Sequence, residues 1–378
     1  MKARLSGFLC IGLTSFALLG GCSDSDGKGG AGGNGGDSFG GSGDGGAGGS
    51  APMDVNPLMP TPTVEVVAIV PEMPMDDKPN ETSVGSEGPI WVAAYNYLLF
   101  SDQAENHDHV FKVDAAKPAE ASATIFPYKL GAGKPKTNGL TIGSDGFVYV
   151  AEASTESIWK FKPAAAGVEG TPELVANRFN GAALGKVNDL IVSKKGIVYF
   201  TSAWNGSCST DVNGVYAVGG DKVVKKPISA GDGTNGPKNA NGVALSPDEC
   251  TLYVADDQCY TSAGQSGFVW KYPIAEDGTV GAGTRFITGG ELKKKGELNV
   301  PDGITVDDVG NLYIASNHPD GHAIFVYKPD GTPWGKIAMP ADGPNPSNLS
   351  FGGADRKTLF VTAGYRIYKI AMPIPGAP

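Results

Sequence analysis

The sequence predicts an all-β protein, a six-bladed β-propeller, and two observations carry that prediction. Six segments repeat one pattern, in which an apolar strand, a tight polar turn and a second apolar strand follow one another. The repeat length of 45 to 61 residues is close to that of propeller blades and too long for leucine-rich or ankyrin repeats. Two β-sandwiches would not explain why one pattern recurs six times. The six segments begin at Glu87, Asn138, Asn188, Asn241, Asp302 and Ser347.

Each unit also contains a third strand and a weaker fourth strand. Residues 157–162 and 323–327 are examples of the third strand, and residues 173–176 are an example of the fourth. The last unit ends after its third strand at residues 366–370, whereas residues 64–70 form a strand with no unit of their own. We therefore expect the N-terminal strand to complete the last blade and close the ring, since closure removes an exposed sheet edge.

An uneven distribution of glycine divides the chain. Residues 27–49 hold 14 of the 56 glycines, mixed with Ser, Ala, Asp and Asn, and no packed core can form from that composition. We expect residues 22–62 to be a flexible tether and residues 63–378 to be the propeller. The tether would reach on the order of 30–40 Å.

Residues 1–21 have the features of a lipoprotein signal peptide. Lys2 and Arg4 precede an apolar run that is too short for a comfortable membrane span. The sequence Leu-Gly-Gly-Cys ending at Cys22 resembles a bacterial lipobox, which predicts cleavage before Cys22 and lipidation of its thiol; an ordinary secretory signal is the alternative. Ser23 resembles the pattern for outer-membrane sorting. The predicted location is therefore the outer membrane facing the periplasm, with attachment through the lipid alone.

The charge of the chain excludes one class of partner. Cleavage would take the formal net charge from −10 to −12, because two basic residues leave and no acidic residue does. An acidic protein without a basic cluster is a poor ligand for nucleic acid. We expect a monomer that binds a small molecule, no nucleic acid, and a membrane only through its lipid.

The first residues of the six units are all polar, and the alternate positions after them are almost all apolar. Because the innermost strands of a propeller run along its axis, these residues would form a ring at one mouth of the central channel. The ring offers oxygen donors, including two carboxylates, and no Cys or His. Clustered carboxylates in an apolar channel favour a bound cation, and oxygen-only ligands prefer Ca²⁺ and then Mg²⁺. The alternative is that the Asn-Gly and Asp-Gly pairs only turn the chain into each strand.

Within roughly residues 84–362 the chain resembles the SMP-30/gluconolactonase/regucalcin-like (LRE) family of six-bladed propellers. The motifs that carry the resemblance are residues 87–91, 187–189, 241–248, 301–307 and 351–353.

The resemblance implies one axial divalent ion held by Glu87, Asn241 and Asp302, with Asn188 beside it. The oxygen-only donors make Ca²⁺ the first choice of ion, with Mg²⁺ or Zn²⁺ as the others. The resemblance also implies that the protein opens a sugar-acid lactone or a related ester, with Asp302 as the general base.

This chemistry is physically reasonable, because a bound cation polarises a carbonyl and lowers the pKa of a coordinated water whose proton Asp302 could take. Two alternatives stay open. One is a non-catalytic propeller that binds a ligand or a protein and keeps a structural Ca²⁺. The other is a phosphotriesterase-like hydrolase.

Four residues are expected to shape the substrate pocket: Asn138, Lys186, Trp204 and His318. Many lactonases have Arg or Ser-Pro where Lys186-Val187 stands here, and lysine cannot make the bidentate carboxylate contact of arginine. We therefore expect the metal ring of the family with a changed substrate pocket.

The cysteines are expected to have separate roles. Cys10 leaves with the signal and Cys22 carries lipid, which leaves three cysteines in the body. Cys208 and Cys259 follow the second strands of adjacent units, so both belong to loops of one face and are predicted to form a disulfide. Cys250 lies in the opposite hairpin turn and is predicted to be free.

Overall fold

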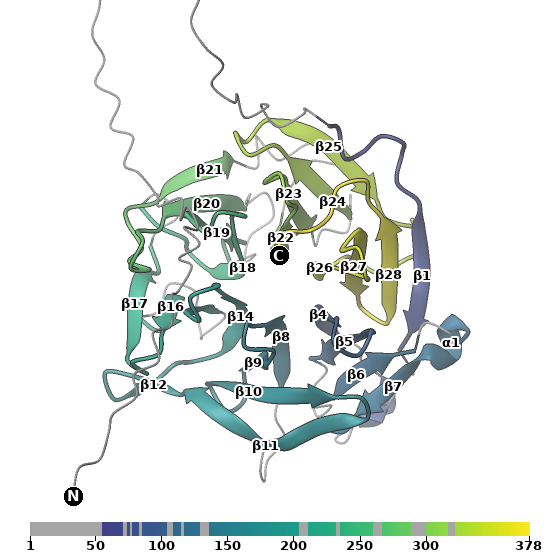
Figure 1. The fold of residues 1–378 in the computed structure, drawn as a ribbon, viewed down its shortest axis with the longest axis horizontal. Coiled ribbons are helices and arrows are strands. Elements are labelled where there is room, and N and C mark those ends of the chain that lie inside the picture. Colours follow the sequence, from purple (N-terminus) through teal and green to yellow (C-terminus); the bar gives the residue numbers. More distant parts are fainter. Residues whose placement is uncertain are drawn as a thin grey trace, which may run out of the picture. The chain divides into compact units, whose positions relative to one another are not determined.

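The computed structural model describes residues 55–70, 74–75, 78–82, 85–103, 109–114, 117–128, 136–203, 211–231, 235–259, 267–288, 300–316 and 322–378. Within them, six antiparallel sheets of four strands each are arranged around a common axis (Figure 1). The fold is therefore a six-bladed β-propeller, as the repeat predicts.

In each blade the strands follow one another outward from the axis. The first three blades are β4 (Ser86–Val92), β5 (Tyr97–Asp102), β6 (Val110–Val113) and β7 (Ala123–Phe126); β8 (Thr137–Ile142), β9 (Val148–Glu152), β10 (Ser157–Ala164) and β11 (Gly167–Ala176); and β14 (Val187–Val192), β15 (Val198–Ser202), β16 (Gly214–Val218) and β17 (Val224–Ser229). The next two are β18 (Ala240–Leu245), β19 (Thr251–Asp256), β20 (Phe268–Pro273) and β21 (Thr284–Thr288); and β22 (Pro301–Val306), β23 (Leu312–Ser316), β24 (Ala323–Tyr327) and β25 (Pro333–Ala338).

Three small elements lie outside the blades. They are the hairpin of β2 (Pro74–Met75) and β3 (Lys78–Thr82), the hairpin of β12 (Arg178–Phe179) and β13 (Ala182–Ala183), and the helix α1 (Ala119–Ser122). No helix in the described ranges is long and apolar enough to cross a membrane.

The sixth blade joins the two ends of the propeller. It consists of β26 (Asn348–Gly352), β27 (Thr358–Ala363), β28 (Arg366–Ala371) and, as its outermost strand, β1 (Val64–Ile69). β1 runs antiparallel to β28, which confirms that the N-terminal strand closes the ring. Leu58, a residue of the predicted tether, also packs against the hydrophobic core of the last two blades.

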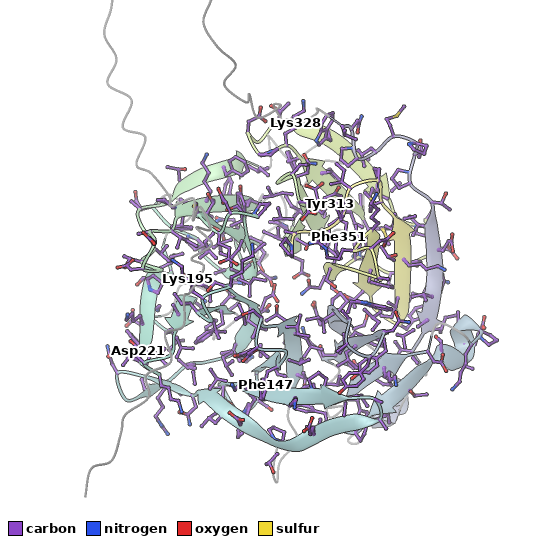
Figure 2. The ribbon with its side chains drawn as sticks, in the orientation of Figure 1. Phe147, Lys195, Asp221, Tyr313, Lys328 and Phe351 are labelled. Carbon is purple, nitrogen blue, oxygen red and sulfur yellow. The ribbon has the colours of Figure 1, made fainter. Side chains whose placement is uncertain are left out.

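Burial of β1 holds the last blade against the first. Ala68 is fully buried and belongs to a cluster with Phe100 and Phe111 of the first blade and Ile367 of the sixth. Aromatic side chains fill the neighbouring space between blades: Phe351 lies edge-on to Tyr313, with ring centroids 5.2 Å apart (Figure 2). Each such pair contributes about 0.5–1.5 kcal/mol beyond its buried area.

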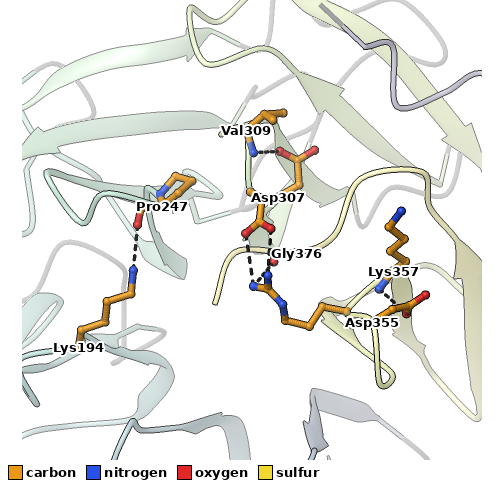
Figure 3. A network of polar contacts seen from close by, with 9 residues as sticks. Lys194, Pro247, Asp307, Val309, Asp355, Lys357 and Gly376 are labelled. Carbon is orange, nitrogen blue, oxygen red and sulfur yellow. Dashed lines mark hydrogen bonds and ion pairs between the residues drawn. The ribbon is translucent and has the colours of Figure 1, made fainter. Parts of the chain in front are cut away.

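The C-terminal segment makes a second closure, at the end of the inner strands opposite the predicted ring. Asp308 N–H donates to Pro375 O (2.8 Å) and Ala377 N–H donates to Val306 O (3.0 Å). The Arg356 guanidinium pairs with the Asp308 carboxylate (3.0 Å) and donates to Gly376 O (2.7 Å) (Figure 3). The chain end thereby ties the fifth blade to the sixth.

If closure by β1 stabilises the ring, a carboxylate at Ala68 should be much more damaging than one at Val66. Ala68 is 0% exposed and Val66 is 38% exposed on the same strand, so Ala68→Asp buries an unpaired charge and Val66→Asp does not. We expect Ala68→Asp to lower the free energy of unfolding by at least ~3 kcal/mol. Denaturant titration measures the difference, and equal losses in the two variants would contradict this role for β1.

Candidate functional site

The predicted ring residues lie at the same end of the innermost strands, where the backbone bulges. The pairing register shifts at the start of β4, β8, β14, β18 and β22. In the last four of these strands the two residues within the shift are a ring residue and its successor, such as Asn241-Gly242 and Asp302-Gly303. A bulge bends a strand and redirects side chains, so these pairs shape the axis from within strands rather than turning the chain into them.

Glycine after the ring residue allows the innermost strands to touch. A Cβ atom on Gly242 would collide with Asp302 O, and one on Gly303 would collide with Asn348 Oδ1. Neither glycine has a positive φ. Glycine is therefore needed at these positions because it has no side chain, and not because the backbone is in an unusual conformation. Asn241 and Asp302 are therefore carried by inner strands in direct backbone contact.

In two units the residue after the ring residue is polar instead of glycine. These two residues are Asp189 and Asn348. Asp189 is buried and accepts hydrogen bonds from Leu190 N (2.9 Å) and Val243 N (3.2 Å), which links the third blade to the fourth. Asn348 Oδ1 accepts from Leu349 N (2.8 Å), and its side chain also hydrogen-bonds to both Glu87 and Asp189. Both hydrogen bonds lower the pKa of the acid that receives them, as a donor to the ionised form does, so the Asn348 Nδ2 group is the donor.

Glu87 and Asp189 form a buried acid pair. Burial, and after it the nearby Asp189 carboxyl, raise the pKa of Glu87 to about 8 against the opposing hydrogen bonds from Asn348, Gly88 N and Ser347. Burial likewise raises the pKa of Asp189 to about 6. Two carboxylates in a dry site disfavour each other's charge, and a cation between or beside them relieves both effects.

The amide members of the ring offer oxygen atoms for such a cation. Asn138 Oδ1 is buried and has no hydrogen-bond partner among the residues that the structure describes, which is costly for a carbonyl oxygen unless another group satisfies it. Asn241 donates Nδ2 to Asp257 Oδ2 (3.2 Å), which leaves its oxygen for another partner. Asn188 and Asp302 are half-buried. An oxygen-only donor set of this kind fits a hard divalent ion.

Other buried carboxylates hold loops instead. Asp102, Glu152 and Asp256 each end the second strand of a blade and accept backbone N–H groups from the segment that leads into the inner strand, for example Gly85 N on Asp102 (3.0 Å) and Asn239 N on Asp256 (3.0 Å). Their shared position in the repeat is a signal that the sequence interpretation missed. Within the described ranges, no three His, Cys, Asp or Glu side chains form a group that could hold a metal.

The structure places the predicted pocket residues unevenly. Asn138 lies in the ring, and Lys186 has an exposed side chain while its carbonyl accepts from Ala203 N (3.0 Å). Trp204 and His318 lie outside the described residues, as do Cys22 and the first part of the predicted tether.

The cysteines require a correction. Cys250 is disulfide-bonded, so the prediction of a free thiol at this position is wrong. Cys259 is also disulfide-bonded, and the two residues flank opposite ends of the six-residue strand β19, ~20 Å in length, which places them beyond the reach of a bond to each other. Cys208 lies outside the described residues, so its pairing with Cys259 stays a prediction.

Comparison with known proteins decides the family. The family model of the SMP-30/Gluconolactonase/LRE-like region matches residues 85–365. The gluconolactonase of Zymomonas mobilis is 32% identical over 297 residues, which cover 75% of this chain and 78% of that protein. The chain belongs to the SMP-30/gluconolactonase/LRE-like family.

Solved structures of this family share the fold. A gluconolactonase from Xanthomonas campestris has a TM-score of 0.61 at 22% identity, with 84% of this chain and 92% of that chain covered. Regucalcin from Agrobacterium tumefaciens, described as a calcium-binding protein, has a TM-score of 0.59 at 17% identity, with 82% and 95% covered. The resemblance seen in the sequence is thus confirmed for family and fold.

The raised pKa of Glu87 predicts how the metal-free protein responds to pH. The folded-state pKa of about 8 lies above the ordinary value of 4.5, so this group stabilises the fold fully below pH 4.5 and loses that contribution as pH rises through 8. Glu87→Gln cannot ionise. With a chelator present, we expect the variant to gain stability over the wild type from pH 5 to pH 9, by on the order of 2–4 kcal/mol.

Thermal unfolding across this pH range measures the effect, with the exposed Glu120→Gln as the control for removal of one negative charge. A pH-independent difference between Glu87→Gln and the wild type would contradict the assignment of a high pKa to Glu87.

Proposed function

We propose that the protein is a divalent-metal-dependent hydrolase that opens a lactone or a related ester. The observation that carries the proposal is a set of carboxylate and amide residues at the same end of the innermost strands, in a chain that is 32% identical to a gluconolactonase. The buried Asn138 oxygen and the high pKa of Glu87 support a cation there, because each is the feature that a bound ion would satisfy.

Glu87, Asn241 and Asp302 would hold the ion, with Asn188 beside it. A divalent ion bound there would polarise the lactone carbonyl and lower the pKa of a water next to it. Ca²⁺ is our first choice because all donors are oxygens and a regucalcin shares the fold; Mg²⁺ and Zn²⁺ are the other candidates.

The chain's own groups would perform the remaining tasks. Asp302 is half-buried at the mouth of the ring, so it can exchange a proton with solvent and act as the general base. Asn348, which also hydrogen-bonds to Asp189, would orient Glu87 through the hydrogen bond described above. The loops with Trp204 and His318 would contact the substrate.

Turnover of a panel of lactones, aryl esters and phosphotriesters, after chelation and after return of Ca²⁺, tests this proposal. We expect Ca²⁺-dependent lactone opening, with kcat/KM lowered at least ~100-fold in Asn241→Ala and Asp302→Asn. Asp308→Asn is the matched control, because Asp308 follows the opposite end of the same strand as Asp302 and pairs with Arg356.

The alternatives give different outcomes. Calcium binding without turnover of any substrate would favour a binding propeller, and turnover confined to phosphotriesters would favour a phosphotriesterase. Lactone opening that survives chelation and Asp302→Asn would contradict the proposed mechanism.

We also propose that Cys22 is acylated and anchors the protein to the outer membrane facing the periplasm. The lipobox-like sequence and the glycine-rich segment after it support this proposal. Radiolabelled palmitate should be incorporated by the wild type and not by Cys22→Ser, and the variant should be recovered in the soluble fraction. Equal labelling of the two proteins would contradict the anchor.

A further inference from the structure

A further buried acid is hydrogen-bonded to one of the proposed metal ligands, Asn241. Asp257 is 2% exposed and follows β19 of the fourth blade. Its Oδ2 accepts from Asn241 Nδ2 (3.2 Å) and from Asn239 Nδ2 (3.0 Å), and its Oδ1 accepts from Asn239 Nδ2 (2.9 Å) and Cys259 N (2.8 Å). Every contact that the structure gives this carboxyl group is therefore with an N–H donor.

These contacts determine which way the Asn241 amide faces. Asn241 Nδ2 is the donor to Asp257 Oδ2, so the NH₂ end of the Asn241 amide lies toward Asp257 and the oxygen end lies away from it. No hydrogen bond from a described residue reaches Asn241 Oδ1. The oxygen is thus the end that remains for a cation on the axis.

The segment that carries Asp257 is held in a costly conformation. Gln258 and Cys259 both have positive φ, 57° and 70°, which are uncommon for residues other than glycine and cost on the order of 1–3 kcal/mol each. The disulfide at Cys259 and a chain of buried amides, in which Asn213 Nδ2 donates to Asn239 Oδ1 (3.3 Å), keep the segment in place. The position of Asp257 is therefore fixed from several sides.

We infer that Asp257 is a positioning residue for the metal: it orients the Asn241 amide so that the amide oxygen faces the axial site. The inference rests on the proposed function, since it needs Asn241 to be a ligand. Groups behind a metal ligand that fix its orientation typically change metal affinity by 10–100-fold.

The neighbouring Asp256 is also a buried acid, but its hydrogen bonds support only the surrounding loop and strand. Asp256 is 0% exposed and accepts from Lys238 N (3.1 Å), Asn239 N (3.0 Å) and Trp270 Nε1 (3.1 Å), and none of these partners is a ring residue. It supports the loop and the third strand of the blade. Asp256→Asn is therefore the matched control for burial and for loss of one charge.

Calcium affinity of the chelator-treated full-length protein tests the inference, by calorimetry and by Tb³⁺ luminescence. We expect Asp257→Asn to weaken Ca²⁺ binding at least 10-fold, while kcat at saturating Ca²⁺ stays within a few-fold of the wild type. Asp256→Asn should lower the melting temperature and leave the Ca²⁺ affinity within about twofold. The exchanged pair Asn241→Asp with Asp257→Asn should recover part of the affinity, because it restores one N–H···O contact and a ligand oxygen on the axis.

The Ca²⁺ affinity of Asp257→Ser is measured in parallel, so that a second variant is available if Asp257→Asn does not fold. An unchanged Ca²⁺ affinity in a folded Asp257 variant would overturn the positioning role and leave the proposed function intact. A wild-type protein that binds no Ca²⁺, Mg²⁺ or Zn²⁺ would overturn both.

Discussion

The close approach of the six innermost strands at one end of the axis is the constraint on which the rest of the structure depends. Four units place glycine there, and the collisions that a Cβ atom would cause at Gly242 and Gly303 show how little space is left. The other two units have Asp189 and Asn348 in place of glycine. These residues and Glu87 form a buried hydrogen-bonded group. The same packing that closes the axis therefore also desolvates its acids.

Desolvation gives this site its chemistry. Burial, as the largest cause, raises the pKa values of Glu87 and Asp189 to about 8 and 6, so both acids are costly to ionise without a compensating charge. In the proposed metal site, a bound cation would supply that charge.

The sequence predicted the parts of the structure that repeat. Six repeated units, the closing strand and the polar first residues of the units all follow from one pattern, and the fold and family are confirmed. The contacts within the site depend on residues from blades far apart in the chain, so Asp189, Asn348 and Asp257 were missed. The replacement of glycine at residues 189 and 348 was a visible signal, whereas Asp257 and the disulfide at Cys250 required spatial neighbours that periodicity does not give.

A crystal structure of the protein grown with Ca²⁺ shows whether the propeller axis holds an ion. We expect one ion on the axis, with oxygens of Glu87, Asn241 and Asp302 at about 2.3–2.6 Å and Asn241 Nδ2 still hydrogen-bonded to Asp257. An axis without an ion at saturating Ca²⁺, with Glu87 and Asp189 still hydrogen-bonded through Asn348, would contradict this expectation.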